Sequence, residues 1–202
     1  MNIVEIKTFK FSELSTKAKQ TAIDQYRNDE FYPFDDWYDF IKSDFHEILE
    51  LIGFYNIGSC FSGFSSQGDG ASFTADYTYK KGCLKAIKNY APSDKELYNI
   101  VNGIVSHQKD NGYKLECIIT HSGSMYSHSS TMRFEWTKGN DSYFEWKNNF
   151  VESEIEQLFK DLADWYYSKL YNEYEYIMSD ECIIENIDSN EYDFLESGKQ
   201  YY

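Results

Sequence analysis

The sequence contains few prolines and no long apolar run. Its 202 residues include 2 prolines and 11 glycines, which argues against long disordered linkers. No stretch approaches the roughly 18 uninterrupted apolar residues of a membrane span. The N-terminal MNIVEIKTFKF lacks the basic start and long apolar run of a signal peptide. We therefore expect a soluble, cytoplasmic protein with no membrane partner, long enough to bury one sizeable core.

Cysteine is scarce, and the four cysteines lie far apart. Cys60, Cys83, Cys117 and Cys182 form no CxxC pair and no other short metal-type spacing. In a chain without an export signal, this dispersion is typical of free thiols rather than of a disulfide framework or a structural zinc site. The sequence indicates no cofactor, and the question of a bound metal stays open.

Positive charge is scarce as well, and the deficit is uneven. The chain has 34 acidic and 19 basic residues, a formal net charge of -15. Residues 151–202 hold 14 acidic and 3 basic residues (net -11), whereas residues 1–150 hold 20 and 16 (net -4). Such a segment repels nucleic acid and anionic membranes and attracts a basic protein surface. An ordinary solvated acidic face is the alternative interpretation.

Aromatic residues are abundant, at 19% of the chain with 19 tyrosines, and in the C-terminal segment they alternate with carboxylates. Carboxylates on a rigid helix can imitate a phosphate backbone, and tyrosine is enriched at binding surfaces. We therefore predict that this segment binds a partner with a basic groove. The predicted partner-binding residues are Glu152, Glu156, Asp164, Trp165, Tyr167, Glu173 and Glu175.

Hydrophobic periodicity predicts an α+β fold. Alternating or β-branched runs predict strands over 1–11, 54–64, 71–80, 113–120, 131–138 and 142–146, with a terminal extended piece over 192–202. Amphipathic runs and caps predict helices over 13–27 (N-cap Ser15 or Thr16), 35–52, 85–90, 93–107, 151–178 and 180–188. Gly53 is the predicted stop of the second helix, and Ser93 with Glu96 is a predicted capping box that opens the fourth. Because the strand pairs carry hairpin signals, we expect an antiparallel sheet of about five or six strands with helices on one face. The predicted organisation is a single domain, with a sheet-containing body over 1–150 and an acidic helical extension over 151–202 docked on it.

The loop FSGFSSQGDGASF, residues 61–73, is the first candidate site. Gly68 and Gly70 could expose backbone N–H groups to an anion. However, the segment continues into a strand without the lysine of a phosphate-binding loop, and Asp69 would repel phosphate. Two interpretations remain. Asp69 could be an acid or a metal ligand, with Gln67 as a neutral hydrogen-bonding group. Alternatively, Gly-Asp-Gly could form a hairpin turn with positive φ angles, which we favour.

The connector HSGSMYSHSS is the second candidate site, with His121, Tyr126 and His128. If the flanking strands pair, the two imidazoles could meet and bind a metal together with Asp69 or Asp76. A serine–histidine nucleophile pair is a further alternative, although no GxSxG motif is present. Its candidate nucleophiles are Ser122, Ser124 and Ser127. A solvated polar hairpin would explain the same composition.

Four segments carry a resemblance to a known group. They are FKFSELSTKAKQTAIDQYR, FSGFSSQGDGASF, MYSHSSTM and IIENIDSNEYDFLESGKQYY. On these segments the chain resembles small acidic proteins encoded by phages and prophages. The resemblance implies a mobile-element origin and assigns no catalytic residue. Small acidic phage proteins are often host-takeover or anti-defence factors, and some block CRISPR effectors.

These observations lead to one expected function and two alternatives. We expect a non-enzymatic phage protein that binds a host defence complex, such as a CRISPR effector, through its acidic surface in the bacterial cytoplasm. The first alternative is a protein that sequesters a nucleotide signal, using the 61–73 loop and Arg133. The second is a metal-dependent enzyme that uses Asp69, His121 and His128.

Overall fold

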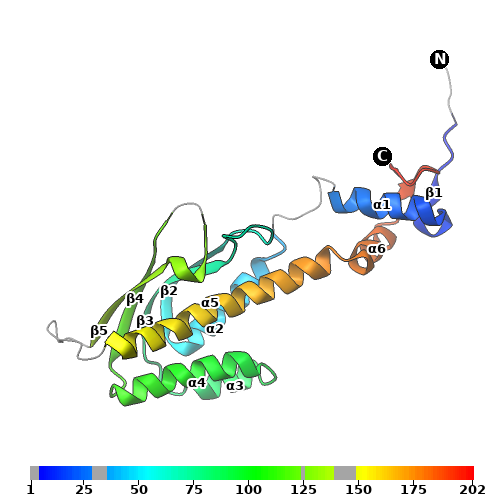
Figure 1. Ribbon diagram of the computed structural model, residues 1–202. Helices are drawn as coiled ribbons and strands as arrows, with labels where there is room; N and C mark the ends of the chain where they lie inside the picture. The colour runs from blue at the N-terminus through cyan, green and yellow to red at the C-terminus, as the bar shows by residue number, and fades with distance from the viewer. Residues whose placement is uncertain (1–4, 29–35, 124–125, 139–148) are drawn as a thin grey trace. The chain divides into compact units, whose positions relative to one another are not determined.

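The computed structural model describes residues 5–28, 36–123, 126–138 and 149–202 (Figure 1). The chain forms two compact units. Unit 2 is the continuous segment Tyr38–Tyr171, and unit 1 combines the chain ends, Met1–Trp37 and Asn172–Tyr202. The predicted boundary at residue 150 does not coincide with this division. The long helix α5 (Asn149–Ile177) belongs to unit 2 as far as Tyr171 and to unit 1 beyond it.

Unit 2 contains a four-stranded antiparallel sheet in the order β2-β3-β4-β5. Its strands are β2 (Phe54–Phe61), β3 (Ala71–Thr78), β4 (Leu115–His121) and β5 (Met132–Lys138). The predicted pairing of the last two strands is confirmed, with Cys117 opposite Trp136. Because β2–β3 and β4–β5 are both hairpins in one antiparallel sheet, their connecting loops emerge at the same end of the sheet.

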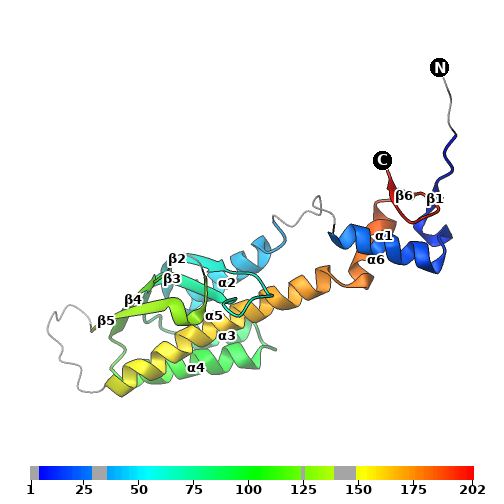
Figure 2. The same ribbon diagram turned by 45° about the horizontal axis from the view of Figure 1, so that its top comes forward.

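The helices of unit 2 cover one face of this sheet (Figures 1 and 2). They are α2 (Asp39–Ile52), α3 (Cys83–Tyr90), α4 (Lys95–Asp110) and the first part of α5. Alternate β3 residues from Ala71 to Tyr77 are buried toward the helices, as the two-residue period of a strand requires. The Phe159 ring of α5 lies 5.0 Å from those of Phe54 and Tyr77. On the opposite face Ile118 is 46% exposed.

Three helix ends in unit 2 can be compared with their predicted positions, and one of them agrees. Gly53 ends α2 with φ +121°, which confirms the predicted glycine stop. At the start of α4 the predicted cap was Ser93, but the next residue, Asp94, caps the helix, and its side chain accepts from Leu97 N. Both residue types cap well, so local propensity alone does not distinguish them. Helix α2 begins at Asp39, four residues after the predicted start.

Unit 1 packs two helices against a small three-stranded sheet in the order β1-β6-β7. Its elements are β1 (Phe9–Lys10), the 3₁₀-helix η1 (Phe11–Glu13), α1 (Thr16–Asn28), α6 (Asp180–Ser189), β6 (Asp193–Phe194) and β7 (Gln200–Tyr201). Of the strand predicted over residues 1–11, the described part contains only Phe9–Lys10. A small core joins the two chain ends, with the Phe11 and Phe194 rings 6.1 Å apart.

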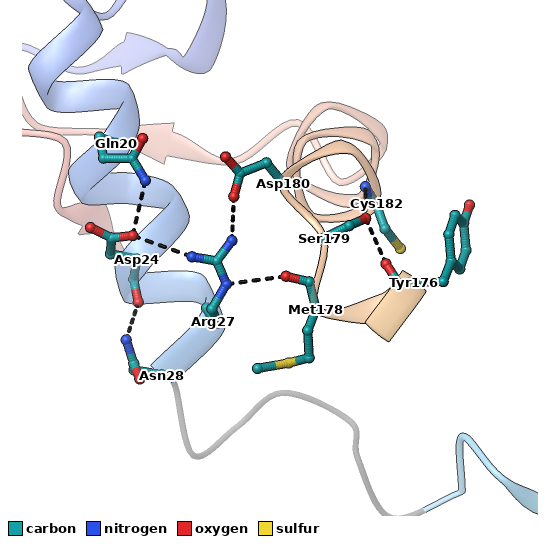
Figure 3. A network of polar contacts seen from close by, with 9 residues as sticks. All are labelled: Gln20, Asp24, Arg27, Asn28, Tyr176, Met178, Ser179, Asp180 and Cys182. Carbon is teal, nitrogen blue, oxygen red and sulfur yellow. Dashed lines mark hydrogen bonds and ion pairs between the residues drawn. The ribbon is translucent and has the colours of Figure 1, made fainter. Parts of the chain in front are cut away.

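Arg27 at the end of α1 joins that helix to the segment that opens α6 (Figure 3). Its Nε donates to Met178 O at 3.2 Å, and its guanidinium pairs with the Asp180 carboxylate. Asp24, one turn earlier on α1, lies 3.4 Å from Arg27 Nη1 and holds the guanidinium in place. One side chain therefore connects elements more than 150 residues apart in sequence.

The α+β class with antiparallel sheets and C-terminal helices is confirmed. Among the described residues the strands divide into a four-stranded and a three-stranded sheet, whereas the sequence predicts one sheet of five or six. The strand predicted over 142–146 lies outside the described residues. The described part of the chain holds no helix with the length and apolar character needed to cross a bilayer.

Candidate functional site

The two loops singled out in the sequence meet at one end of the four-stranded sheet. The Ser62 hydroxyl lies 3.1 Å from Ser127 N, from which it accepts, and 3.1 Å from Ser127 O, to which it donates. The Ser127 hydroxyl lies 3.0 Å from Cys60 Sγ. The β2–β3 and β4–β5 loops therefore form one polar cluster, and we call them the joined loops. Sequence spacing alone does not indicate this contact.

Gly68 and Gly70 are required by this close approach. A Cβ on Gly68 would lie 2.9 Å from Tyr126 Cδ1, and one on Gly70 would lie 2.7 Å from His128 Cδ2. Neither glycine has positive φ; in this loop that conformation occurs at Gly63, with φ +55°. The glycines thus make room for the second loop instead of presenting N–H groups to a phosphate.

Asp69 is committed to its own loop. Its Oδ2 accepts from Ser65 N and Ser66 N, both at 2.6 Å, and its own N–H donates to Ser66 O at 3.1 Å. A carboxylate that bonds nearby backbone N–H groups stabilises a tight turn. The segment is therefore a turn, but the positive φ angles expected at Gly-Asp-Gly are wrong, because none of Gly68, Asp69 and Gly70 has positive φ. Gln67 is exposed beside the turn.

The two histidines are likewise used locally. His121 Nε2 lies 3.2 Å from Tyr126 O. His128 Nδ1 accepts from Ser130 N at 3.0 Å and caps the 3₁₀-helix η2 (Ser129–Thr131). The predicted metal set of Asp69, His121 and His128 is not assembled, because these three side chains do not come together. Within the ranges the structure describes, no three His, Cys, Asp or Glu side chains gather in a way that could hold a metal ion.

The alternative ligands and nucleophiles of these loops also have other contacts. Ser122 Oγ donates to Thr131 O at 3.1 Å, Asp76 Oδ2 accepts from Asn56 Nδ2 at 2.6 Å, and Arg133 Nη1 donates to Ser130 O at 3.1 Å. Ser124 lies outside the described residues. The predicted serine–histidine pairing is thus not formed by Ser122 or by Ser127, whose hydroxyl faces Cys60.

Aromatic side chains attach helix α5 to the first loop. The Phe64 ring lies 5.5 Å from Tyr167 and 5.8 Å from Tyr171, and Tyr167 Oη donates to Gly63 O at 3.1 Å. Burial, and secondarily the Asp69 carboxylate, raise the pKa of Tyr167, which keeps the hydroxyl protonated as a donor. Tyr167, predicted to bind a partner, here serves internal packing.

Two more predicted partner-binding residues lie inside unit 2. Trp165 is only 4% exposed, and its Nε1 donates to Asp94 Oδ2 at 3.1 Å. Glu156 Oε1 accepts from Trp136 Nε1 at 3.1 Å. The prediction that Trp165 anchors a partner is wrong, because the helix periodicity turns its ring toward the core. The side chain of Glu152 lies outside the described residues.

Asp94 is the centre of a second polar network. Its Oδ2 also accepts from Lys169 Nζ at 2.8 Å. Burial alone would raise the pKa of this carboxyl, but hydrogen bonds from Lys169, from Leu97 N and from Trp165 outweigh burial and lower it. Asp94 therefore ties the start of α4 to α5, with its charge compensated.

An acidic cleft of about 490 Å³ lies between α4 and α5. Its lining is Glu96, Asn99 and Ile100 of α4, and Asp161 and Asp164 of α5. Asp161 accepts from Gln157 Nε2 at 2.8 Å, while Glu96 and Asp164 are exposed and form no ion pair among the described residues. Asp164 was predicted from the sequence; Glu96 was missed because it comes from a different helix and carries only a capping signal.

The charge is distributed unequally between the units. Unit 1 has 16 acidic and 6 basic residues (net -10), and unit 2 has 18 and 13 (net -5). Residues 172–202 hold 9 of these carboxylates and a single basic residue, Lys199. Glu173 is half-buried and Glu175 is exposed in this segment.

The protein thus has an α+β fold with an acidic cleft in unit 2. Residues 37–180 match the family model described as a domain of unknown function, DUF8835, and the chain belongs to that family. Since the match contains all of unit 2, both the joined loops and the cleft lie in the family domain. Neither the curated proteins nor the solved structures compared with the chain gave a match.

Proposed function

We propose that this protein is a binding protein that presents the α4–α5 cleft to a positively charged macromolecule and acts without catalysis. The observation that carries the proposal is the convergence of Glu96, Asp161 and Asp164 on one open hollow without a lysine among its lining residues. Mutual repulsion among three carboxylates is relieved when a cation enters.

An arginine or lysine side chain has the chemistry that the cleft requires. A guanidinium can bind carboxylates in a bidentate manner, and the apolar stem of the arginine can lie on Ile100, which also lines the cleft. Each exposed pair contributes only about 0–1 kcal/mol. Affinity therefore has to come from several pairs, and it will fall as salt screens them.

The resemblance to small acidic phage proteins supports a particular class of partner. A host defence complex such as a CRISPR effector has a basic groove for nucleic acid, and occupation of that groove by acidic side chains would exclude the nucleic acid. We therefore propose a phage-encoded anti-defence inhibitor that works by occlusion in the bacterial cytoplasm.

Matched charge reversals test the proposal. The variant Glu96→Lys/Asp164→Lys changes the cleft, whereas Glu50→Lys/Glu135→Lys makes the same charge change at exposed sites elsewhere in unit 2. Binding to a fluorescent nona-arginine peptide and inhibition of DNA cleavage by guide-loaded effectors would be measured at low and moderate salt. We expect the cleft variant to lose about tenfold or more in affinity and inhibition, and the control less than about threefold.

The outcomes separate three cases. Equal losses in both variants would mean that total charge, and not the cleft, binds the cation. Unchanged binding in both would remove the acidic surface from the mechanism. Peptide binding without inhibition of any effector would retain the cleft and contradict the anti-defence assignment.

A further inference from the structure

A second hollow in unit 2 has the opposite character. It measures about 400 Å³ and lies where the end of β3 meets α3 and α4, with Tyr79, Cys83, Lys85, Lys88, Tyr98 and Val105 among its lining residues. Volumes of this size are typical of small-molecule sites. No carboxylate lines it.

Positive charge is concentrated around this hollow. Residues 77–93 contain four lysines and no acidic residue, in a chain with a net charge of -15. Lys80 Nζ donates to Glu50 O at 2.8 Å, whereas the exposed Lys85 and Lys88 form no ion pair among the described residues. Asp44 and Glu47 accept hydrogen bonds from Tyr90 Oη, at the last residue of α3. The hollow is thus a local anion-attracting region on an acidic protein.

The interior of the hollow is apolar and uncharged. The Tyr79 ring is held by Tyr113, at a centroid distance of 4.6 Å. Cys83 is 3% exposed, and burial raises the pKa of its thiol, so it remains neutral. Aromatic walls suit a flat ring, since stacking on tyrosine is favourable for any nucleobase. Lys85 and Lys88 line the hollow and are exposed, so a phosphate bound between their ammonium groups would remain partly hydrated.

We propose that this hollow binds a mononucleotide, with the base against Tyr79 and Tyr98 and the phosphate between Lys85 and Lys88. The site is distinct from the acidic cleft and from the two joined loops. It assigns to unit 2 a small anionic ligand in addition to a cationic macromolecular partner.

Calorimetric titration of the full chain with AMP, adenosine and inorganic phosphate tests the assignment, with GMP and UMP as further bases. The variant Lys85→Gln/Lys88→Gln removes the phosphate contacts. The variant Lys109→Gln/Lys114→Gln makes an identical charge change at exposed lysines outside the hollow. We expect the first variant to weaken AMP binding about tenfold or more and to leave adenosine binding unchanged. We expect the second to change AMP binding less than about twofold. Tyr98→Leu should weaken AMP and adenosine alike.

Several results would overturn the proposal. They are no binding of AMP, GMP or UMP at millimolar concentration, phosphate binding as tight as AMP binding, or equal losses in the two lysine variants. Amide chemical shifts provide a second measurement that does not depend on any variant. Shifts induced by AMP should map to residues 79–88 and 98–105, and shifts confined to the 61–73 and 121–131 loops would contradict this site. Because Glu96→Lys/Asp164→Lys leaves the hollow intact, AMP binding in that variant distinguishes failure of this proposal from failure of the proposed function.

Discussion

At the residue scale, two glycines between β2 and β3 lie where a methyl group would not fit. A Cβ added at Gly70 would lie closer to His128, and one added at Gly68 closer to Tyr126, than real Cβ contacts allow. The usual functions of glycine in a loop, positive φ or exposed backbone N–H groups, do not explain either position. The constraint is contact between two hairpin loops, and this contact is a long-range property that local sequence does not contain.

Gly70→Ala should destabilise the protein by about 1–3 kcal/mol, because the new methyl would lie 2.7 Å from His128 Cδ2. Urea unfolding would measure the loss. In the background His128→Ala the same change should cost clearly less, since the obstructing ring is absent. An equal cost in both backgrounds would show that the loops do not touch at this point.

Asp94 provides a test of which residue caps α4. Asp94→Ala should lower the free energy of unfolding by about 1–2 kcal/mol at pH 7, because it removes the cap and the partner of Trp165 and Lys169. Ser93→Ala, at the cap predicted from sequence, should change it by less than about 0.5 kcal/mol. A larger loss of stability in Ser93→Ala than in Asp94→Ala would show that Ser93 caps the helix.

The contribution of the Asp94 carboxylate to stability has a defined pH dependence. The pKa of Asp94 is lower in the folded protein than in the unfolded chain, so the ionised carboxylate favours folding. This contribution is complete above about pH 4, the ordinary aspartate pKa, and is lost as pH falls through the folded-state value. The stability gap between wild type and Asp94→Ala should therefore stay constant down to about pH 4 and narrow as the pH falls below that value. A gap that widened toward low pH would contradict the direction of the shift.

At the element scale, the strongly periodic segments were predicted well and their partners were not. Burial of one face produces an apolar stripe in α2, α4 and α5 and an alternation in β5. Because these patterns are visible in the sequence, the four elements lie near their predicted residues. Trp165 and Tyr167 show the limit. They lie on a helix that was predicted correctly, but which of its faces is covered depends on where α2, α4 and the 61–73 loop pack.

The short elements of unit 1 had weaker signals. Strand β1 pairs with β6, about 180 residues later, through Phe9 opposite Phe194. Alternation in MNIVEIKTFKF predicted a longer strand, but the partner strand is only two residues long. A strand persists only where a neighbour accepts its backbone hydrogen bonds, so its length is determined by the other end of the chain.

The connection between α1 and α6 can be tested at Arg27. Arg27→Ala should lower the stability of unit 1 by about 1–2 kcal/mol, since it removes the hydrogen bond to Met178 O and the pair with Asp180. Asp180→Asn should cost about 1 kcal/mol or less, and 0.5 M NaCl should reduce that cost. Hydrogen exchange of α6 amides would report both effects. The control Asp188→Asn, an exposed carboxylate on the same helix, should leave exchange unchanged, and equal acceleration by all three would exclude a specific role for Arg27.

At the scale of the whole molecule, the two units differ in net charge and in how far the family match covers them. The family match contains unit 2 entirely, and this unit holds the cleft, the joined loops and the lysine-lined hollow at a net charge of -5. Most of the excess negative charge belongs to unit 1, built from the chain ends. The acidic residues of the segment 151–202 are therefore divided between unit 2, up to Tyr171, and unit 1, from Asn172.

This division predicts how salt acts on the protein. Like charges repel in a compact state, and unit 1 carries a net -10 in about half as many residues as unit 2 with its net -5. Raising NaCl from about 20 to 500 mM, where the Debye length falls below 10 Å, should slow hydrogen exchange more in α6 than in β4. Neutralising exposed carboxylates with Glu181→Gln/Glu185→Gln should reproduce part of the effect at low salt, whereas Glu116→Gln/Glu135→Gln in unit 2 should not. If salt instead protected β4 first, local ion pairs and not net repulsion would govern the stability of unit 1.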